Sequence, residues 1–282
     1  MPQKLKKRSS KEIKKLKPFL DEWVEKIEIS SYIDNDPVLF MHAFNEKEDQ
    51  LLAGFFAAIM AWGRRDVVIR KVRDLLDRMD NRPADFITHF SDADAGCFRG
   101  FKHRTFKPVD MVWLTKILQS ILREYGSFED FWSACYLKAK QDKRPLISVF
   151  HEDFFALQPE TPQRTYKHVS NADKKSSCKR LYLYLRWAVR KISPVDLGLM
   201  DFMPPSELMI PLDVHVARQA RALGLLSRTY NDWWAVGELT EALRLLDPGD
   251  PAKYDYALFG LGVDEKGIPA EFIFNHSYEN NG

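Results

Sequence analysis

Apolar residues recur at helical spacing along almost the whole chain. Between residues 112 and 122 they fall at i, i+3, i+4, i+7 and i+8, the pattern of a helix with one buried face. The segment 50–62 is apolar on nearly every side, which predicts a helix that is buried centrally among others. Since no pair of strand segments stands out, the pattern predicts an all-α fold.

Turn and capping residues give the expected helix boundaries. Gly63 ends the apolar helix, and Asp66 is expected to cap the helix that follows it. Ser127 is expected to cap another helix, and Asn231 or Asp232 a third. We expect loops at residues 80–108, 139–145, 157–178 and 193–211, where turn residues and polar stretches gather.

One segment fits two kinds of secondary structure. RLYLYLRW, residues 180–187, alternates as a half-buried strand would, yet its apolar residues also form a helical stripe that continues to residue 192. The length of the stripe favours the helix. Residues 1–17 are expected to form a basic tail or a frayed helix, and residues 18–282 a single compact helical domain.

The composition indicates a soluble protein. Of 282 residues, 45% are hydrophobic and 29% are charged, which is typical of a globular chain. The cysteines Cys97, Cys135 and Cys178 are widely spaced, so they predict neither a disulfide framework nor a four-thiolate metal site. The basic start lacks the apolar stretch of a secretory signal, and no apolar run approaches the ~20 residues of a membrane span. We therefore expect a cytoplasmic protein without a metal or cofactor.

Charge is distributed unevenly although the formal net charge is only +2. Residues 164–191 contain nine Lys or Arg and one acid, whereas residues 228–255 contain three basic and six acidic residues. The segment 99–108, RGFKHRTFKP, adds four basic residues interleaved with two phenylalanines. Such clusters form either a face that binds nucleic acid or an ordinary solvated surface.

Asp213 lies where a helix is expected to begin, in the segment PLDVHVARQARALGL of residues 211–225. A carboxylate at this position caps backbone amides and lies at the positive end of the helix dipole. The spacing alone fits a plain helix cap. Arg218 and Arg221, one turn apart, fit either a phosphate clamp or surface ion pairs.

This segment resembles the part of the helix-hairpin-helix DNA glycosylase superfamily that carries its catalytic aspartate. The matching positions are Asp213, His215, Val216, Arg218, Leu223 and Gly224. Residues 10–275 more closely resemble the bacterial family known as domain of unknown function 2400, on the segments KRLYLYLRW, PLDVHV and YDYALFGLGV. The resemblance implies a two-lobed helical fold with a cleft near residues 175–215.

The resemblance also implies a chemistry, the removal of a damaged (oxidised) base from DNA. Asp213 would stabilise the cationic sugar, and a lysine at the start of the preceding helix would be the nucleophile. Lys179 is the candidate, with Lys174 and Lys175 as alternatives. A helix N-terminus disfavours an ammonium ion, which favours the neutral amine. Each lysine equally fits a phosphate contact or a surface charge.

The expected partner is double-stranded DNA. The residues assigned to its binding are Arg64, Arg65, Lys102, Arg104, Lys174, Lys175, Arg180, His215 and Arg218. His215 and His168 have no carboxylate or histidine at i+3 or i+4, which argues against a metal site. The aromatic residues Tyr182, Tyr184 and Trp187 fit a stacked base or, more commonly, a core.

The chain departs from the superfamily in several places. HVSNADKKSSCKR replaces the glycine-containing hairpin, the separation of Lys179 and Asp213 is longer, and the turn after the first core helix is WGRRD. The four-cysteine cluster of the superfamily is also missing. A catalytically silent nucleic-acid-binding module and a protein-interaction scaffold therefore remain as alternatives. The lesion, the choice between monofunctional and bifunctional chemistry, and the oligomeric state stay open.

Overall fold

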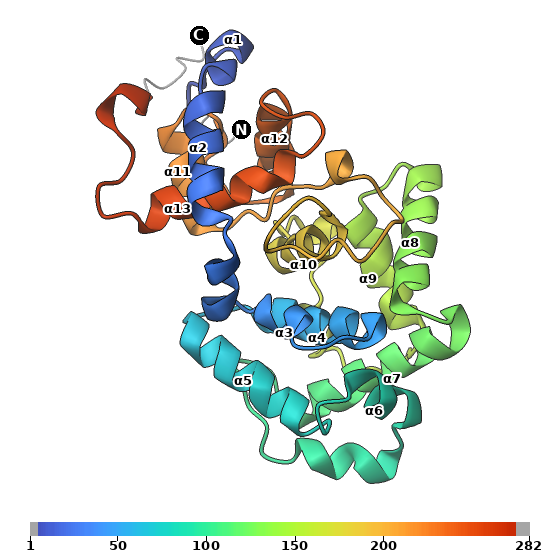
Figure 1. Ribbon diagram of the computed structural model, residues 1–282. Coiled ribbons are helices and arrows are strands. Elements are labelled where there is room, and N and C mark those ends of the chain that lie inside the picture. The colour runs from blue at the N-terminus through green and yellow to red at the C-terminus, as the bar shows by residue number, and fades with distance from the viewer. Residues whose placement is uncertain (1–4, 275–282) are drawn as a thin grey trace. The chain divides into compact units, whose positions relative to one another are not determined.

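The computed structural model describes residues 5–274 and contains helices without any strand in that range, which confirms the all-α prediction. The α-helices are α1 (Ser10–Lys14), α2 (Lys17–Ile27), α3 (Leu39–His42), α4 (Lys47–Met60), α5 (Arg65–Asp77), α6 (Pro83–His89), α7 (Pro108–Tyr125), α8 (Phe128–Asp142), α9 (Leu146–Ala156), α10 (Lys179–Val189), α11 (Val214–Ala222), α12 (Trp233–Arg244) and α13 (Tyr254–Val263). Seven short 3₁₀ turns join them (Figure 1).

The chain divides into two compact units. The terminal unit consists of residues 1–32, 172–186 and 204–282, and the central unit of residues 33–171 and 187–203. The division falls within α10, whose first eight residues belong to the terminal unit.

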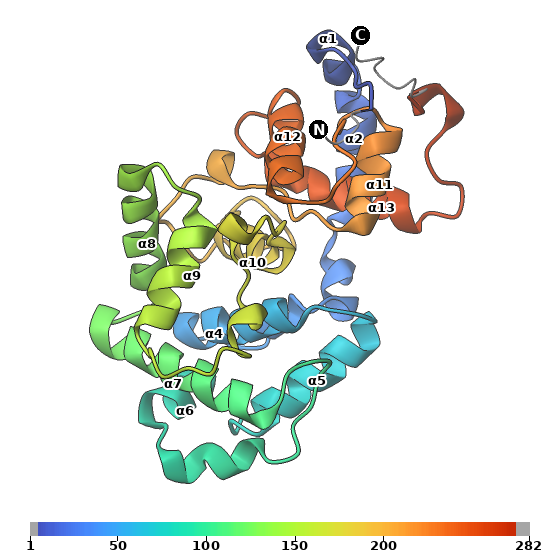
Figure 2. The same cartoon turned by 180° about the vertical axis from the view of Figure 1, so that it is seen from behind.

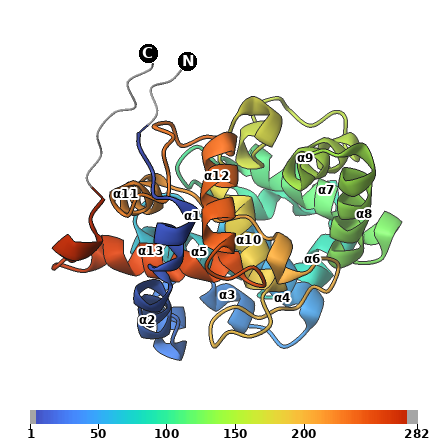
Figure 3. The same cartoon turned by 90° about the horizontal axis from the view of Figure 1, so that it is seen from above.

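The terminal unit brings together helices from both ends of the chain. Figures 1 and 3 show α2 beside α13, and α13 also packs on α11. Gly260 on α13 permits this approach, since a Cβ there would lie only 2.5 Å from Ile27 Cγ1 of α2. The apolar sequence YDYALFGLGV suits a helix that is covered on most sides. The core of this unit therefore depends on contacts between segments that are far apart in the sequence.

The central unit is built around α4. All ten residues from Leu51 to Met60 are buried, which confirms the prediction of a central apolar helix. Phe55 packs edge to face against Phe128 and Phe150, with ring centroids 5.2 and 6.2 Å away. Figure 2 shows α8 beside α9 and α6 beside α7 in the same unit. Aromatic packing thus forms much of this core.

Most of the predicted caps are present. The side chains of Ser127, Asp213 and Asp232 each accept a backbone hydrogen bond at the start of their helices. The prediction for Asp66 is wrong, because the N-cap of α5 is Arg64 and Asp66 already lies in the first turn. Its carboxylate instead accepts from the Arg64 guanidinium, at 3.1 and 3.0 Å.

The ambiguous segment is helical, but α10 ends at Val189, before the predicted end at residue 192. The chain folds back here, and the backbone N–H groups of Leu197 and Met200 donate to the carbonyls of Trp187 and Ala188. These bonds satisfy carbonyl groups at the helix end, so a further turn is not needed. The expected loop at 80–108 is also only partly correct, because it contains α6 and a 3₁₀ turn at Asp92–Phe98.

Candidate functional site

The structure brings Lys179 and Asp213 together within the terminal unit. Lys179 is the first residue of α10, and Asp213 is the N-cap of α11. The Lys179 Nζ atom lies 2.9 Å from Asp213 Oδ2, and the two side chains are 33% and 27% exposed. The pair is therefore accessible from solvent although it is held by two helix N-termini.

The two carboxylate oxygens of Asp213 have different partners. Oδ1 accepts from the backbone N–H groups of His215 and Val216, both at 2.9 Å. Oδ2 faces the Lys179 ammonium. One oxygen thus fixes the side chain to the helix, while the other presents its charge to a cation.

The environment keeps Asp213 ionised. Burial acts to raise the pKa of Asp213, but the Lys179 charge and the amides of Val216 and His215 outweigh it, so the pKa is lowered overall. A carboxylate with a lowered pKa is a poor proton acceptor at neutral pH. The ionised Asp213 carboxylate is therefore suited to electrostatic stabilisation of a positive charge.

The loop before α10 has a strained backbone. Lys175 and Cys178 adopt φ of +62° and +50°, the left-handed region that residues other than glycine seldom occupy. The loop is anchored to the start of α12, because Ser176 pairs with Asp232 and the Lys175 carbonyl accepts from Trp233 N–H at 3.3 Å. The anchored loop fixes where α10 and Lys179 begin.

The predicted DNA-binding residues of this unit differ in their exposure. Lys174, Lys175, His215 and Arg218 are exposed. Arg180 is half-buried, and burial lowers its pKa to about 10. The first four side chains are thus more accessible to solvent than Arg180 is.

A cluster that the sequence did not reveal lies beside this loop. Trp234 at the start of α12 is 51% exposed, and the Arg228 guanidinium and Lys175 ammonium lie 5.2 and 5.7 Å from its ring centroid. Asp232 holds Arg228 through both carboxylate oxygens, at 2.6 and 2.5 Å. The interleaved charges and aromatics of RTYNDWW, residues 228–234, were the available signal.

Both ends of the described chain hold the far end of α11. The Arg8 guanidinium donates to the carbonyls of Leu223 and Phe272, each at 2.9 Å. Its Cζ atom lies 5.1 Å from the Phe274 ring centroid. The backbone N–H groups of Arg8 and Phe274 donate to Gly224 and Ala222 at 2.9 and 2.8 Å. The carbonyls at the C-terminus of α11 are therefore satisfied by distant segments.

The other predicted DNA-binding residues lie in the central unit, where two turns meet. The Arg104 guanidinium lies over the Trp62 ring, 5.6 Å from its centroid, and Arg104 Nε donates to the Trp62 carbonyl at 3.2 Å. Lys102 and Arg64 are exposed nearby in sequence, on the same two turns. Arg65 pairs with Asp36 at 3.4 Å.

Several basic residues of the segment 164–191 are internal. The side chains of Arg186 and Arg190 are each 2% exposed and pair with Asp255 and Asp196. These arginines stabilise the interior of their units and do not contribute to a basic face. The basic surface of this segment is therefore smaller than its sequence suggests.

One buried cluster of polar side chains in the central unit contains Asp110 and His168. Arg164 donates to Asp110 at 3.0 and 2.8 Å, Thr165 donates at 2.8 Å, and His168 Nε2 lies 3.3 Å away. Burial acts to raise the pKa of Asp110, but these donors outweigh it and lower the pKa. Phe106 stacks on His168 with a centroid distance of 3.7 Å. This arrangement joins the start of α7 to the loop after α9.

The aromatic side chains of α10 that were considered for base stacking lie in the core. Tyr182, Tyr184 and Trp187 are 3%, 0% and 0% exposed. Tyr182 stacks with Trp233, with ring centroids 6.0 Å apart. Between residues 5 and 274, no group of three or more potential metal-binding side chains comes together.

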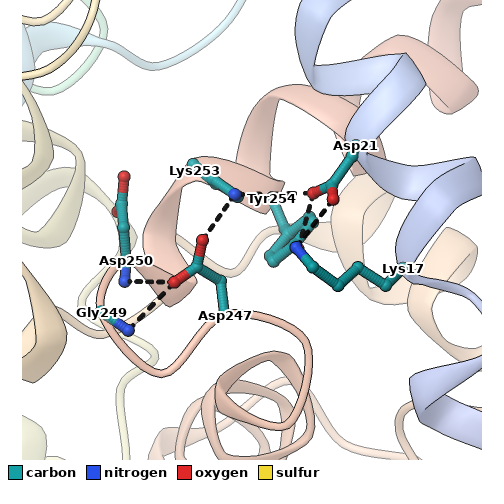
Figure 4. A network of polar contacts seen from close by, with 7 residues as sticks. All are labelled: Lys17, Asp21, Asp247, Gly249, Asp250, Lys253 and Tyr254. Atoms are coloured by element: carbon teal, nitrogen blue, oxygen red, sulfur yellow. Dashed lines mark hydrogen bonds and ion pairs between the residues drawn. The ribbon is translucent and has the colours of Figure 1, made fainter.

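A polar network in the terminal unit joins α2 to the turn before α13 (Figure 4). Lys253 lies between Asp247 and Asp21, at 2.6 and 3.5 Å, and Tyr254 donates to Asp21 at 2.8 Å. Asp247 also accepts from the N–H groups of Gly249 and Asp250. Because the carboxylates of Asp21 and Asp247 have their donors within the network, these contacts join α2 to the turn before α13.

Comparison with known proteins places the chain in a family. The model described as "Protein of unknown function (DUF2400)" matches residues 36–264, a span that includes Lys179, Asp213 and Trp234 but not Arg8. No curated protein and no solved structure matches the chain. Among the residues that the structure describes, no helix has both the length and the apolar character needed to cross a membrane. Since the match covers well over half of the 282 residues, the chain belongs to the DUF2400 family of proteins of unknown function.

Proposed function

We propose that this protein binds DNA and removes a damaged base by cleaving its N-glycosidic bond, with Lys179 as nucleophile and Asp213 as the stabilising carboxylate. The observation that carries the proposal is the solvent-accessible contact of 2.9 Å between Lys179 Nζ and Asp213 Oδ2. The similarity of the Asp213 segment to helix-hairpin-helix glycosylases supports the same role. A cation and an anion at two helix starts are the groups that this chemistry requires.

The reaction begins when the neutral Lys179 amine attacks C1′ of the sugar. The bond from C1′ to the base breaks, its electron pair leaves with the base, and the base takes the proton that the amine releases. The C1′–O4′ bond then opens, O4′ takes a proton from solvent, and an iminium ion joins Lys179 to C1′. Asp213 Oδ2 stabilises the positive charge that develops on the sugar, while Oδ1 stays bound to the α11 amides.

Borohydride trapping on oligonucleotides that carry a panel of damaged bases tests this proposal. Borohydride reduces the iminium ion to a stable covalent adduct, which we expect for the wild type and not for Lys179→Ala. Lys11→Ala is the control, because this exposed lysine is assigned neither to DNA binding nor to the chemistry. Release of free base is measured in parallel, since a monofunctional enzyme would release base without an adduct. The absence of both a covalent adduct and base release on every substrate would refute the enzymatic proposal.

A catalytically silent DNA-binding module is the second candidate. It is favoured by the cap of α11, because Asp213 would be retained for its two backbone hydrogen bonds alone. Both candidates require DNA binding that weakens with salt, with a log–log slope of about −0.9 for each phosphate contact. Arg64→Ala, Lys102→Ala and Arg104→Ala should each reduce that slope by about 0.9 if they contact phosphates. DNA binding would also place the protein on the nucleoid.

A further inference from the structure

Trp234 is an exposed aromatic side chain with two cations beside it. Half of its surface is accessible, at 51%, although it is the second residue of α12. The neighbouring Trp233 instead packs inward against Tyr182. An exposed indole offers an apolar face to a ligand, and nothing in the core of the terminal unit requires this one.

The surroundings of Trp234 are held in place by the fold. Arg228, 5.2 Å from the ring centroid, is fixed by two hydrogen bonds to the N-cap Asp232. Lys175, 5.7 Å from the ring centroid, lies on the anchored loop with φ of +62°. Holding a lysine in the left-handed region costs free energy, which the contacts of this loop with α12 must offset.

The charges of the cluster fit an anionic partner. Arg228 is neutralised by Asp232, whereas no ion pair within residues 5–274 includes Lys175 or Lys174. An uncompensated positive charge, that of Lys175, therefore lies over the indole ring. An aromatic ring beside such a charge matches a nucleotide, whose base stacks and whose phosphate pairs with the cation.

We propose that Trp234 and Lys175 form a stacking site for an unpaired nucleotide. The base stacks on the Trp234 indole, and the adjoining phosphate contacts Lys175. This inference rests on the proposed binding of DNA, because extrusion of a base leaves unpaired nucleotides near the reacting strand. The site is joined to the Lys179–Asp213 pair through the loop that precedes Lys179.

Two substitutions of Trp234 distinguish the effect of its aromatic face from the effect of its apolar bulk. Trp234→Phe keeps an aromatic face, whereas Trp234→Leu keeps an apolar side chain without one. The affinity for a single-stranded oligothymidine should fall roughly 5- to 150-fold in Trp234→Leu and stay within about 3-fold of the wild type in Trp234→Phe. Trp113→Leu in the central unit is the matched control, because Lys116 lies 5.1 Å from the Trp113 ring centroid. It should leave the affinity unchanged.

The lysine and the duplex give two further readouts. Lys175→Ala should reduce the log–log salt slope for single strands by about 0.7, which corresponds to one phosphate contact. Trp234→Leu should change the affinity for a fully paired duplex by less than about 2-fold, because paired bases cannot stack on the ring. Fluorescence anisotropy measures all of these affinities.

The outcomes distinguish this inference from the enzymatic proposal. Equal single-strand affinity of wild type and Trp234→Leu, or an equal loss for duplex and single strand, overturns the stacking site. Absence of any oligonucleotide binding overturns the stacking site together with the proposed function. Single-strand binding that depends on Trp234, without base release on any substrate, supports the stacking site and refutes only the chemistry.

Discussion

Asp213 has two separable contributions to stability, and substitution can measure each. Its Oδ1 atom caps α11 through two hydrogen bonds of 2.9 Å, and its Oδ2 atom pairs with Lys179 at 2.9 Å. Asparagine caps a helix about as well as aspartate but carries no charge. Asp213→Asn therefore removes the charge and keeps the cap, whereas Asp213→Ala removes both.

The two costs follow from the geometry. Loss of an N-cap costs about 1 kcal/mol. An ion pair that is a third exposed contributes about 0.2–1 kcal/mol, and a negative charge at a helix N-terminus about 0.3–1 kcal/mol. The free energy of unfolding should therefore fall by about 1 kcal/mol in Asp213→Asn and by about 2 kcal/mol in Asp213→Ala, on adding the cap term.

Urea denaturation at several pH values is the measurement. Because the pKa of Asp213 is lowered in the folded protein, its charge stabilises the fold fully above the ordinary value of about 3.9. That contribution is lost as the pH falls through the lower folded pKa. The difference between wild type and Asp213→Asn should thus persist at pH 7 and vanish in acid.

Two results would contradict this reasoning. Equal destabilisation by asparagine and alanine at pH 7 would show that the cap contributes nothing. Full base release by Asp213→Asn would show that the charge is not used in catalysis, even if the stability measurements agree. In the proposed enzyme, base release should fall by at least ~100-fold in Asp213→Asn, the scale of losing one electrostatic contact to the transition state.

Three further predictions test the fold. Gly198→Ala should destabilise the fold by about 1–3 kcal/mol, because the φ of Gly198 is +60° and a Cβ there would lie 2.5 Å from a backbone atom. Gly237→Ala in α12 meets open space and should stabilise the fold by about 0.5–1 kcal/mol. Thermal denaturation compares the two variants. Arg186→Met leaves Asp255 buried without its cation and should cost about 3–5 kcal/mol in urea denaturation, part of which is recovered by adding Asp255→Leu. Asp110→Asn should be destabilised relative to wild type at pH 7, and the difference should shrink in acid because the pKa of Asp110 is lowered; equal destabilisation at every pH would refute the electrostatic account.

Local signals were sufficient for much of the fold. The central helix α4 follows from the apolar segment of residues 50–62, and the structure buries its residues Leu51 to Met60. The caps at Ser127, Asp213 and Asp232 follow from residue type and the adjoining apolar stripe. The prediction that Asp66 caps its helix was wrong because the helix begins at Arg65, one residue before Asp66. The chain is already helical at Arg65 after the turn at Gly63, so the carboxylate enters the first turn and pairs with Arg64.

Long-range contacts account for what the sequence could not give. Arg186 and Arg190 resemble surface charges in the sequence, and only the tertiary structure supplies their buried partners Asp255 and Asp196. Arg8 lies 264 positions from Phe272, whose carbonyl it binds. No local pattern predicts such a contact, so the fixation of α11 by both chain ends was not foreseen.

The resting pair of Lys179 and Asp213 also constrains the proposed mechanism. Lys179 Nζ lies 2.9 Å from Asp213 Oδ2, whereas nucleophilic attack needs the amine to be directed at C1′ of the sugar. In the proposed mechanism, DNA binding would therefore have to separate this pair before chemistry begins. As positive charge develops on the sugar, Oδ2 would pair with the sugar in place of Lys179. The two α11 amides that donate to Oδ1 would hold Asp213 in place during this exchange. The cap is then what allows one carboxylate to serve first the lysine and afterwards the sugar.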